Sequence, residues 1–249
     1  MSPRPAVDVV ILTWNDAAVL ARAVASAASQ EGVDATVTVV DNGSAPPATV
    51  EARPHVRLLR SPTNLGVGGG RNLGVRMGHA PWVCVLDSDA SLRPGALRRL
   101  VTPRTADETI GLTAPVFTGQ RADMSAGRAP TPWRKLRRVL NRTDRYAATP
   151  GQGSGTAWDV EFAIGACQVF RRDAFEAVDG IDDSARFGPE DVDFCLRLRR
   201  AGWRVVQVAG DTCEHPARRS SRRLFTRRGL AHAAAFARHW WRHRRVVTA

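Results

Sequence analysis

Two acidic clusters about a hundred residues apart are the parts of this chain best suited to chemistry. Asp87 and Asp89 follow directly after the apolar run 82–86, with one serine between them. A strand that ends in Asp-x-Asp holds two carboxylates on one side of a turn. Hard divalent cations such as Mg²⁺ and Mn²⁺ prefer such oxygens and keep open positions for phosphate. The sequence therefore predicts a metal site where this strand ends.

Glu190 and Asp191 form the second cluster, at the start of a predicted helix that ends at Gly202. A carboxylate in this position can supply a general base, although helix starts also favour acidic residues because of the helix dipole. Asp193 is predicted to be structural, because it stands one turn before Arg197 and can pair with it. A metal, a phosphate and a base together indicate group transfer from a nucleotide-activated donor.

Strands that alternate with helices are predicted to position these clusters. Apolar runs at 8–13, 36–40, 56–59 and 82–86 are typical of buried strands in a parallel sheet. Such βαβ units bind ligands at the carboxyl ends of their strands. Asp41, which follows the second run, falls at that edge together with the first acidic cluster.

The predicted helices begin at recognisable signals. Asn15 or Asp16 is expected to cap the first helix, and the glycine-rich residues 66–70 open another. Residues 118–158 show no clear periodicity, which is typical of a functional lid or of disorder. A strand over 203–208 is expected after the helix that begins with the second acidic cluster.

The charge of the chain is uneven. Its 249 residues fit one large α/β domain, or one domain with a small appendage, and carry a formal net charge of +12. Residues 218–249 contain ten arginines and no Asp or Glu. A basic tail of this kind binds nucleic acid, anionic membrane or acidic ligands, and electrostatics alone does not choose among them.

The expected compartment is the reducing cytoplasm. The four cysteines form no Cys-x-x-Cys pair, which argues against a structural zinc site, and the N-terminal residues before the first strand are too few for a signal peptide. Residues 222–245 combine a basic face with an apolar stripe that includes Trp240 and Trp241. This segment is interpreted either as a helix on the anionic inner face of a membrane or as a helix packed on the sheet, and both interpretations stay open.

Seven segments in order carry a resemblance to a known family: residues 10–15, 40–44, 64–74, 87–89, 171–172, 180–182 and 190–193. Together they resemble the family 2 glycosyltransferases with the GT-A fold, and most of all their bacterial rhamnosyltransferase-type branch. The match runs from about residue 7 to about residue 215. It implies an α/β fold with a Rossmann-like, mostly parallel central sheet flanked by helices.

This resemblance implies a domain division and an activity. Residues 1–217 would form the GT-A domain, with a nucleotide-binding half over about 1–115 and an acceptor half over about 116–217. The basic C-terminal helical segment would occupy 218–249. The implied reaction is inverting, metal-dependent transfer of a sugar from a UDP- or dTDP-sugar to an acceptor hydroxyl, on a lipid-linked glycan or a small natural product.

On the donor side, the resemblance assigns three residues by position. Thr13 would end the first strand at the nucleotide pocket. Asp41 would accept a hydrogen bond from N3–H of the base, which suits uracil or thymine. Arg71 would also lie against the base.

The resemblance also assigns the metal and the base. Asp89 would bind Mg²⁺ or Mn²⁺, Asp87 would face the ribose or a metal-bound water, and His215 would contact the metal or the diphosphate. Asp191 would take the proton of the acceptor hydroxyl, with Glu190 beside it.

Two alternatives from other classes stay open. A basic nucleic-acid-binding protein would explain the net charge, but no known nucleic-acid motif is present and Tyr146 is the only tyrosine for base stacking. No nucleic-acid partner is therefore expected. A non-catalytic module that binds sugar nucleotides is the other alternative, and the intact Asp87, Asp89 and Asp191 argue against it.

Overall fold

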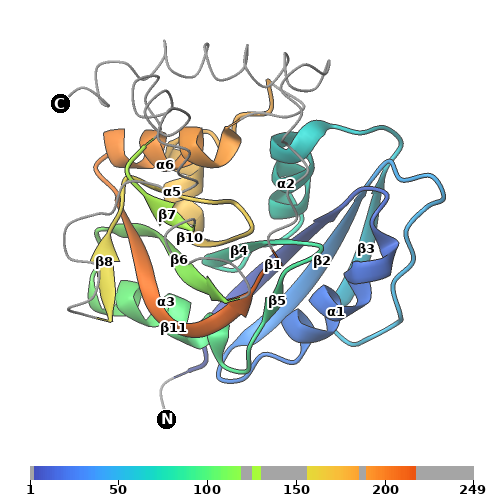
Figure 1. Cartoon of the computed structure of the whole chain (residues 1–249), viewed down its shortest axis with the longest axis horizontal. Helices are drawn as coiled ribbons and strands as arrows, with labels where there is room; N and C mark the ends of the chain where they lie inside the picture. Colours follow the sequence, from blue (N-terminus) through green and yellow to red (C-terminus); the bar gives the residue numbers. More distant parts are fainter. Residues whose placement is uncertain (1–2, 119–124, 130–155, 185–188, 217–249) are drawn as a thin grey trace, which may run out of the picture.

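A single large sheet dominates the computed structural model, which describes residues 3–118, 125–129, 156–184 and 189–216 (Figure 1). The strands are β1 (Ala6–Thr13), β2 (Asp34–Asn42), β3 (Val56–Ser61), β4 (Trp82–Asp87), β5 (Ser91–Leu92), β6 (Ile110–Thr118), β7 (Ala126–Gly127), β8 (Ala157–Asp159), β9 (Phe162–Ala163), β10 (Cys167–Arg171) and β11 (Arg204–Glu214). Within the described part, nine of them form the sheet, in the order β3-β2-β1-β4-β10-β6-β11-β5 with β8 also paired to β11. The short strands β7 and β9 pair separately.

Six of the nine strands of the described sheet point the same way, in agreement with the predicted mostly parallel sheet, whereas β5, β8 and β10 run against them. Strands β3, β2, β1 and β4 run parallel to their neighbours. Strand β10 is antiparallel to both β4 and β6, so β6 and its parallel neighbour β11 point the same way as β4. The carboxyl ends of β1, β2, β4, β6 and β11 therefore meet at one edge.

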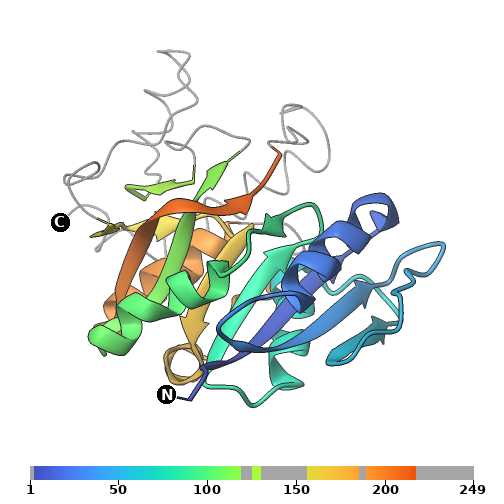
Figure 2. The same ribbon diagram turned by 90° about the horizontal axis from the view of Figure 1, so that it is seen from below.

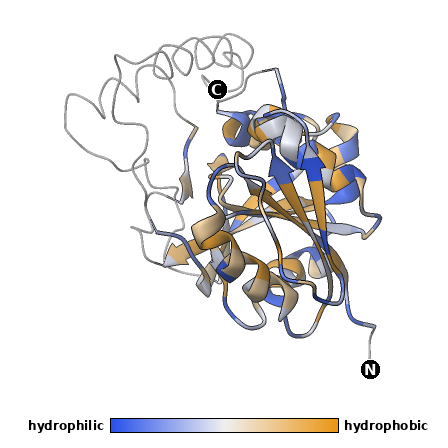
Figure 3. Cartoon of the chain, turned by 90° about the vertical axis from the view of Figure 1, so that its right-hand side faces the viewer, coloured by the Kyte–Doolittle hydropathy of each residue, from blue (hydrophilic) through white to orange (hydrophobic). Residues whose placement is uncertain are grey.

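Helices cover both faces of the sheet. They are α1 (Ala17–Ala28), α2 (Gly66–Arg76), α3 (Ala96–Ala106), α5 (Arg172–Ala177) and α6 (Glu190–Arg200). Helices α1 and α3 pack on one face, whereas α2, α5 and α6 lie on the other (Figures 1 and 2). Alternation along β1 supplies both cores, because Val9 and Ile11 face α1 and Val10 faces α2. The central strands are accordingly coloured mostly as hydrophobic in Figure 3.

The predicted cap of the first helix is only partly confirmed. Asp16 occupies the N-cap position, but its side chain makes no capping hydrogen bond. It instead accepts a hydrogen bond from Ser88 Oγ at 3.4 Å. Asn15 has a left-handed φ of 54°, and its side-chain oxygen accepts a hydrogen bond from Ala45 N at 2.8 Å. These side chains therefore connect loops at the carboxyl edge.

The C-terminal end of α6 and the cysteines follow the sequence predictions. Gly202 has a φ of 89° and follows Ala201, the C-cap of α6, as expected for a helix-ending glycine. Arg197 Nε lies 2.6 Å from Asp193 Oδ2, which confirms the predicted pair one turn apart. All four cysteines are buried and unpaired.

The predicted C-terminal segment 218–249 lies outside the described residues, as does most of the aperiodic segment 118–158. Among the helices that are described, none combines the length and the apolar character needed to cross a membrane.

Helix α2 approaches the sheet closely because glycines on its inner face leave no room for a Cβ atom. A Cβ added at Gly74 would come within 2.4 Å of Val10 Cγ1 and 2.9 Å of Val40 Cγ2. A Cβ at Gly70 would come within 2.4 Å of Leu12 Cδ1. This close approach fixes the helix against β1 and β2.

We expect Gly74→Ala to lower the free energy of unfolding by about 1–3 kcal/mol, because β1 and β2 have no room for the added methyl group. Gly69→Ala is the matched control on the same helix, since its Cβ would meet mainly Leu65 Cβ, at 3.0 Å, on an exposed side chain. Both variants gain roughly 1 kcal/mol of helix propensity, so the difference between them isolates the contact. Urea denaturation measures both, and equal stabilities would contradict this packing argument.

Candidate active site

Three predicted metal ligands meet at the carboxyl edge of the sheet. Asp87 ends β4, Asp89 follows on a turn closed by the Ala90 N–H to Asp87 carbonyl hydrogen bond of 3.1 Å, and His215 directly follows β11. One ligand atom from each of the three side chains lies within 4.8 Å of the others. Two carboxylates and an imidazole are a donor set that Mn²⁺ and Mg²⁺ accept. The residues present therefore fit a divalent cation.

His215 is held in place by its neighbours. Its backbone N–H donates to the Thr118 carbonyl at 3.0 Å, and its ring lies 5.5 Å from that of Phe117. Its Nε2 is 3.3 Å from Asp89 Oδ1. Burial alone would lower the pKa of His215, but the hydrogen bond to Asp89 and the negative charges of Asp87 and Asp89 outweigh it, so the pKa is raised. The imidazole is thus oriented toward the carboxylates.

The predicted acid pair stands at the first turn of α6. Asp191 Oδ2 accepts a hydrogen bond from Gly165 N at 3.0 Å, and its Oδ1 accepts one from Val192 N at 2.8 Å. Burial raises the pKa of Glu190 to about 8, and the charge of Asp191 adds to this shift. Burial also raises the pKa of Asp191, against the two N–H donors. A pair that binds a proton this strongly is suited to accept one near neutral pH.

Arg71 lies between the two acidic clusters. Its guanidinium, on α2, is 3% exposed, and Nη2 lies 2.7 Å from Asp87 Oδ1 and 2.7 Å from the Gly165 carbonyl oxygen. Nη1 is 3.9 Å from Glu190 Oε1. Burial would lower the pKa of Arg71, but the charges of Asp87, Glu190 and Asp191 raise it, so the group stays cationic. The structure thus joins the two predicted clusters around one cation. The expected contact between Arg71 and a nucleotide base stays a prediction.

The remaining predicted donor residues lie at the ends of β1 and β2. Asp41 is buried, and its carboxylate accepts hydrogen bonds from Ser44 N at 3.0 Å and Ala48 N at 2.9 Å. Burial opposes its charge, but hydrogen bonds from Ser44 and Ala48 together with the charge of Arg60 lower the pKa of Asp41. Thr13 Oγ1 is buried and has no hydrogen-bond partner among the described residues. The contact of Asp41 with a base stays a prediction.

Three residues that the sequence analysis did not single out also shape this edge. The amide of Asn42 donates to the Gly66 carbonyl at 3.0 Å and accepts from Leu65 N at 2.9 Å, which fixes the start of α2. The amide of Asn72 donates to the Ile181 carbonyl at 2.7 Å and accepts from its N–H at 3.0 Å. The third is Gly165, which contacts both Arg71 and Asp191. Asn42 and Asn72 stand within the segments 40–44 and 64–74 that carry the family resemblance, and Gly165 is a glycine inside an apolar segment, so a sequence signal was present for each of them.

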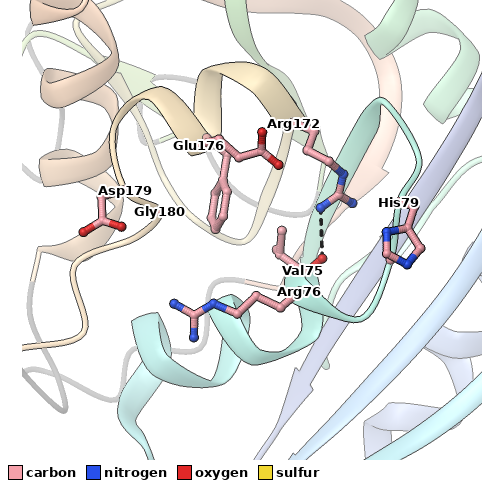
Figure 4. A pocket seen from close by; sticks show the side chains of 9 residues that line it. Val75, Arg76, His79, Arg172, Glu176, Asp179 and Gly180 are labelled. Carbon is pink, nitrogen blue, oxygen red and sulfur yellow. Dashed lines mark hydrogen bonds between the residues drawn. The ribbon is translucent and has the colours of Figure 1, made fainter.

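A separate pocket of about 380 Å³ lies at the opposite end of β4 (Figure 4). Arg172 forms one wall, but its guanidinium donates to the carbonyls of Val75 and Ala80 and pairs with Asp8 at 2.7 Å. Arg76 and Glu176 line the outer part. Since protein groups already engage the arginine, this pocket is interpreted as a structural junction between α2 and α5.

Comparison with solved structures defines the class of the fold. The chain superimposes on the crystal structure of GalNAc-T7 with UDP, GalNAc and Mn²⁺ with a TM-score of 0.72 at 16% sequence identity. The match covers 97% of this chain and 48% of GalNAc-T7. The chain therefore has the GT-A glycosyltransferase fold, as its sequence predicted.

Sequence comparisons define the family. The profile described as "Glycosyl transferase family 2" matches residues 8–179, and the chain belongs to this family. N-acetylglucosaminyl-diphospho-decaprenol L-rhamnosyltransferase of Mycobacterium tuberculosis is 29% identical over 271 aligned residues, which cover 94% of this chain and 86% of that protein. Succinoglycan biosynthesis protein ExoO of Rhizobium meliloti is 45% identical over 101 residues, but these cover only 39% of this chain and 29% of ExoO.

Proposed function

We propose that this chain transfers a sugar, with inversion at the anomeric carbon, from a UDP- or dTDP-sugar to an acceptor hydroxyl. The observation that carries this proposal is the convergence of the metal-type cluster Asp87, Asp89 and His215 with the acid pair Glu190 and Asp191 at one edge of the sheet. The nucleotide-binding half is proposed to span residues 1–115 and the acceptor half residues 116–217.

The donor is proposed to lie along the ends of β1, β2 and β4. Asp41 would accept the N3–H of the pyrimidine base, and Thr13 would line the pocket with its buried hydroxyl. Asp89 and His215 would hold a divalent cation, with Asp87 beside them. When bound, Mg²⁺ or Mn²⁺ would supply Lewis-acid stabilisation to the departing nucleoside diphosphate.

Asp191 is proposed to be the general base. As the acceptor oxygen bonds to the anomeric carbon from the side opposite the diphosphate, its proton would pass to Asp191 and the bond between the anomeric carbon and the diphosphate would break. A carboxylate whose pKa is raised by burial is a better proton acceptor at neutral pH. Glu190 would share the proton of the pair, since the pKa of Glu190 is raised to about 8.

The acceptor is proposed to be a lipid-linked glycan. The name of the M. tuberculosis relative includes an N-acetylglucosaminyl-diphospho-decaprenol, and that relative aligns with nearly the whole of this chain. The ten arginines of residues 218–249 would suit contact with an anionic membrane surface at the inner face. A small natural product is the alternative acceptor.

The experiment that tests this function is a thermal-shift panel of nucleotide-sugars in the presence of Mn²⁺. A ligand at a hundred times its Kd stabilises the folded state by about 2.7 kcal/mol, which corresponds to roughly 5–10 °C for a chain of this size. We expect a UDP- or dTDP-sugar to give this shift and a GDP-sugar to give less. Duplex DNA is the control: a salt-sensitive shift with DNA, and none with nucleotide-sugars, would favour the nucleic-acid alternative.

A further inference from the structure

The guanidinium of Arg71 occupies a position that a nucleotide contact alone does not explain. It is 3% exposed, and its closest charged partner is Asp87, at 2.7 Å. Nη1 and Nε are buried and have no hydrogen-bond partner among the described residues. Nη1 faces Glu190 across 3.9 Å. The cation is thus directed at the two acidic clusters rather than at solvent.

The backbone of one residue, Gly165, connects this cation to the acid pair. The Gly165 carbonyl accepts the Arg71 hydrogen bond at 2.7 Å, and the Gly165 N–H donates to Asp191 Oδ2 at 3.0 Å. The next residue, Ala166, accepts a hydrogen bond from Asp87 N at 2.9 Å. Residues 165–166 therefore contact Arg71, Asp191 and Asp87 at once.

Only glycine permits this arrangement. A Cβ at position 165 would lie 2.5 Å from Arg71 Nη1 and 3.2 Å from its Cζ. The backbone at Gly165 is not left-handed, so the requirement for glycine comes from the guanidinium packed against it. The close approach of the glycine and the direction of the arginine form one unit.

We propose that Arg71, seated on the Gly165 peptide, is a positioning residue for transfer: it sets the spacing between Asp87 and the acid pair Glu190 and Asp191. This inference rests on the proposed function, and it replaces a base contact for Arg71 with a role between two carboxylate groups. Asp87 would be held ready for the metal, and Asp191 would be held toward the acceptor. A planar guanidinium suits this task because it presents several donors in a fixed geometry.

The test compares Arg71→Lys, which keeps the charge but loses the fork, with Gly165→Ala, which keeps the arginine but displaces it. Donor turnover is measured as release of the nucleoside diphosphate, and UDP affinity is measured by calorimetry in EDTA and in Mn²⁺. We expect kcat to fall by about 10²-fold in both variants, the usual effect of a misplacement near 1 Å. UDP affinity in EDTA should stay unchanged, while affinity in Mn²⁺ should weaken by about 10-fold. Arg76→Lys makes the same chemical change at an exposed position of α2 and should match the wild type.

Three results would overturn the proposal. Weaker UDP binding in EDTA for Arg71→Lys would place Arg71 at the base. A normal kcat in both folded variants would assign the pair to structure alone, with thermal unfolding confirming that they fold. A kcat loss in Arg71→Lys without one in Gly165→Ala would separate the arginine from the glycine. Failure of the wild type to bind UDP would instead contradict the proposed function, and so the two failures are distinguishable.

Discussion

Asp191→Asn is expected to lower donor turnover by about 10²–10⁴-fold, the usual contribution of a general base, while UDP affinity stays near that of the wild type. The amide is nearly the same size, but it does not accept a proton. One of the two hydrogen bonds from Gly165 N and Val192 N is lost, because the amide has a single oxygen acceptor. The measurement is turnover beside calorimetric affinity, with a melting curve for each variant.

Asp179→Asn is the matched control for this substitution. Asp179 is exposed and has a φ of 57°, a conformation that Asn also tolerates, so the same chemical change there should leave turnover unaltered.

Wild-type turnover should rise with pH as the acid pair loses its proton, since the pKa of Glu190 is raised to about 8 and only the deprotonated base acts. Near-normal turnover in Asp191→Asn, together with loss in Glu190→Gln, would move the base to Glu190.

The edge of the sheet was predictable from the sequence because its strands are continuous apolar runs. β1, β2 and β4 end at Thr13, Asn42 and Asp87, each within two residues of the end of its predicted apolar run. Helix α2 begins at the glycine-rich stretch, as predicted. These signals are local, because an apolar run, a turn and a glycine face each depend on residues close together in the sequence. The metal-type cluster was predictable for the same reason, since two of its three members are separated by one residue.

Of the acceptor-side strands only β11 was predicted, as the run 203–208, whereas β6, β10 and helix α3 were not, because their signals are not local. Arg104 of α3 is fully buried, where it donates to Thr113 Oγ1 and the Val169 carbonyl and lies 5.3 Å from the Trp82 ring centre. An arginine in a segment with little apolar periodicity predicts an exposed helix rather than one buried in the core. Strand β10 also enters the sheet antiparallel between β4 and β6, a pairing that no nearby residue encodes.

The contact that Arg71 makes between the two acidic clusters could not be predicted from the sequence, because it depends on the folded arrangement of distant segments. Arg71 lies 16 residues before Asp87 and 94 before Gly165. Its partners Asp87, Gly165 and Glu190 come together only when β4, the residues just before β10, and α6 are assembled. The sequence predicted each carboxylate separately and placed Arg71 at a base. The structure supplies what spacing alone does not: a cation common to both clusters.

Asp89→Ala is expected to abolish the gain in UDP affinity that Mn²⁺ or Mg²⁺ brings and to remove most turnover. The variant leaves Asp87 and His215 as the remaining members of a three-ligand cluster. Two ligands of this kind hold a divalent cation poorly, because Mg²⁺ and Mn²⁺ depend on carboxylate oxygens.

Calorimetric titration of UDP into each protein, in EDTA and in Mn²⁺, separates the metal from the nucleotide. The wild type should bind at least about 10-fold more tightly with Mn²⁺, since even indirect metal contacts contribute 10–100-fold, whereas Asp89→Ala should bind equally in both conditions. Asp34→Ala is the control, because Asp34 is exposed at the opposite end of the sheet, where β2 begins. His215→Ala should lose part of the gain if the imidazole contacts the metal. Equal affinities for the wild type in both conditions would rule out the metal site and leave Arg71 as the principal cation at this edge among the described residues.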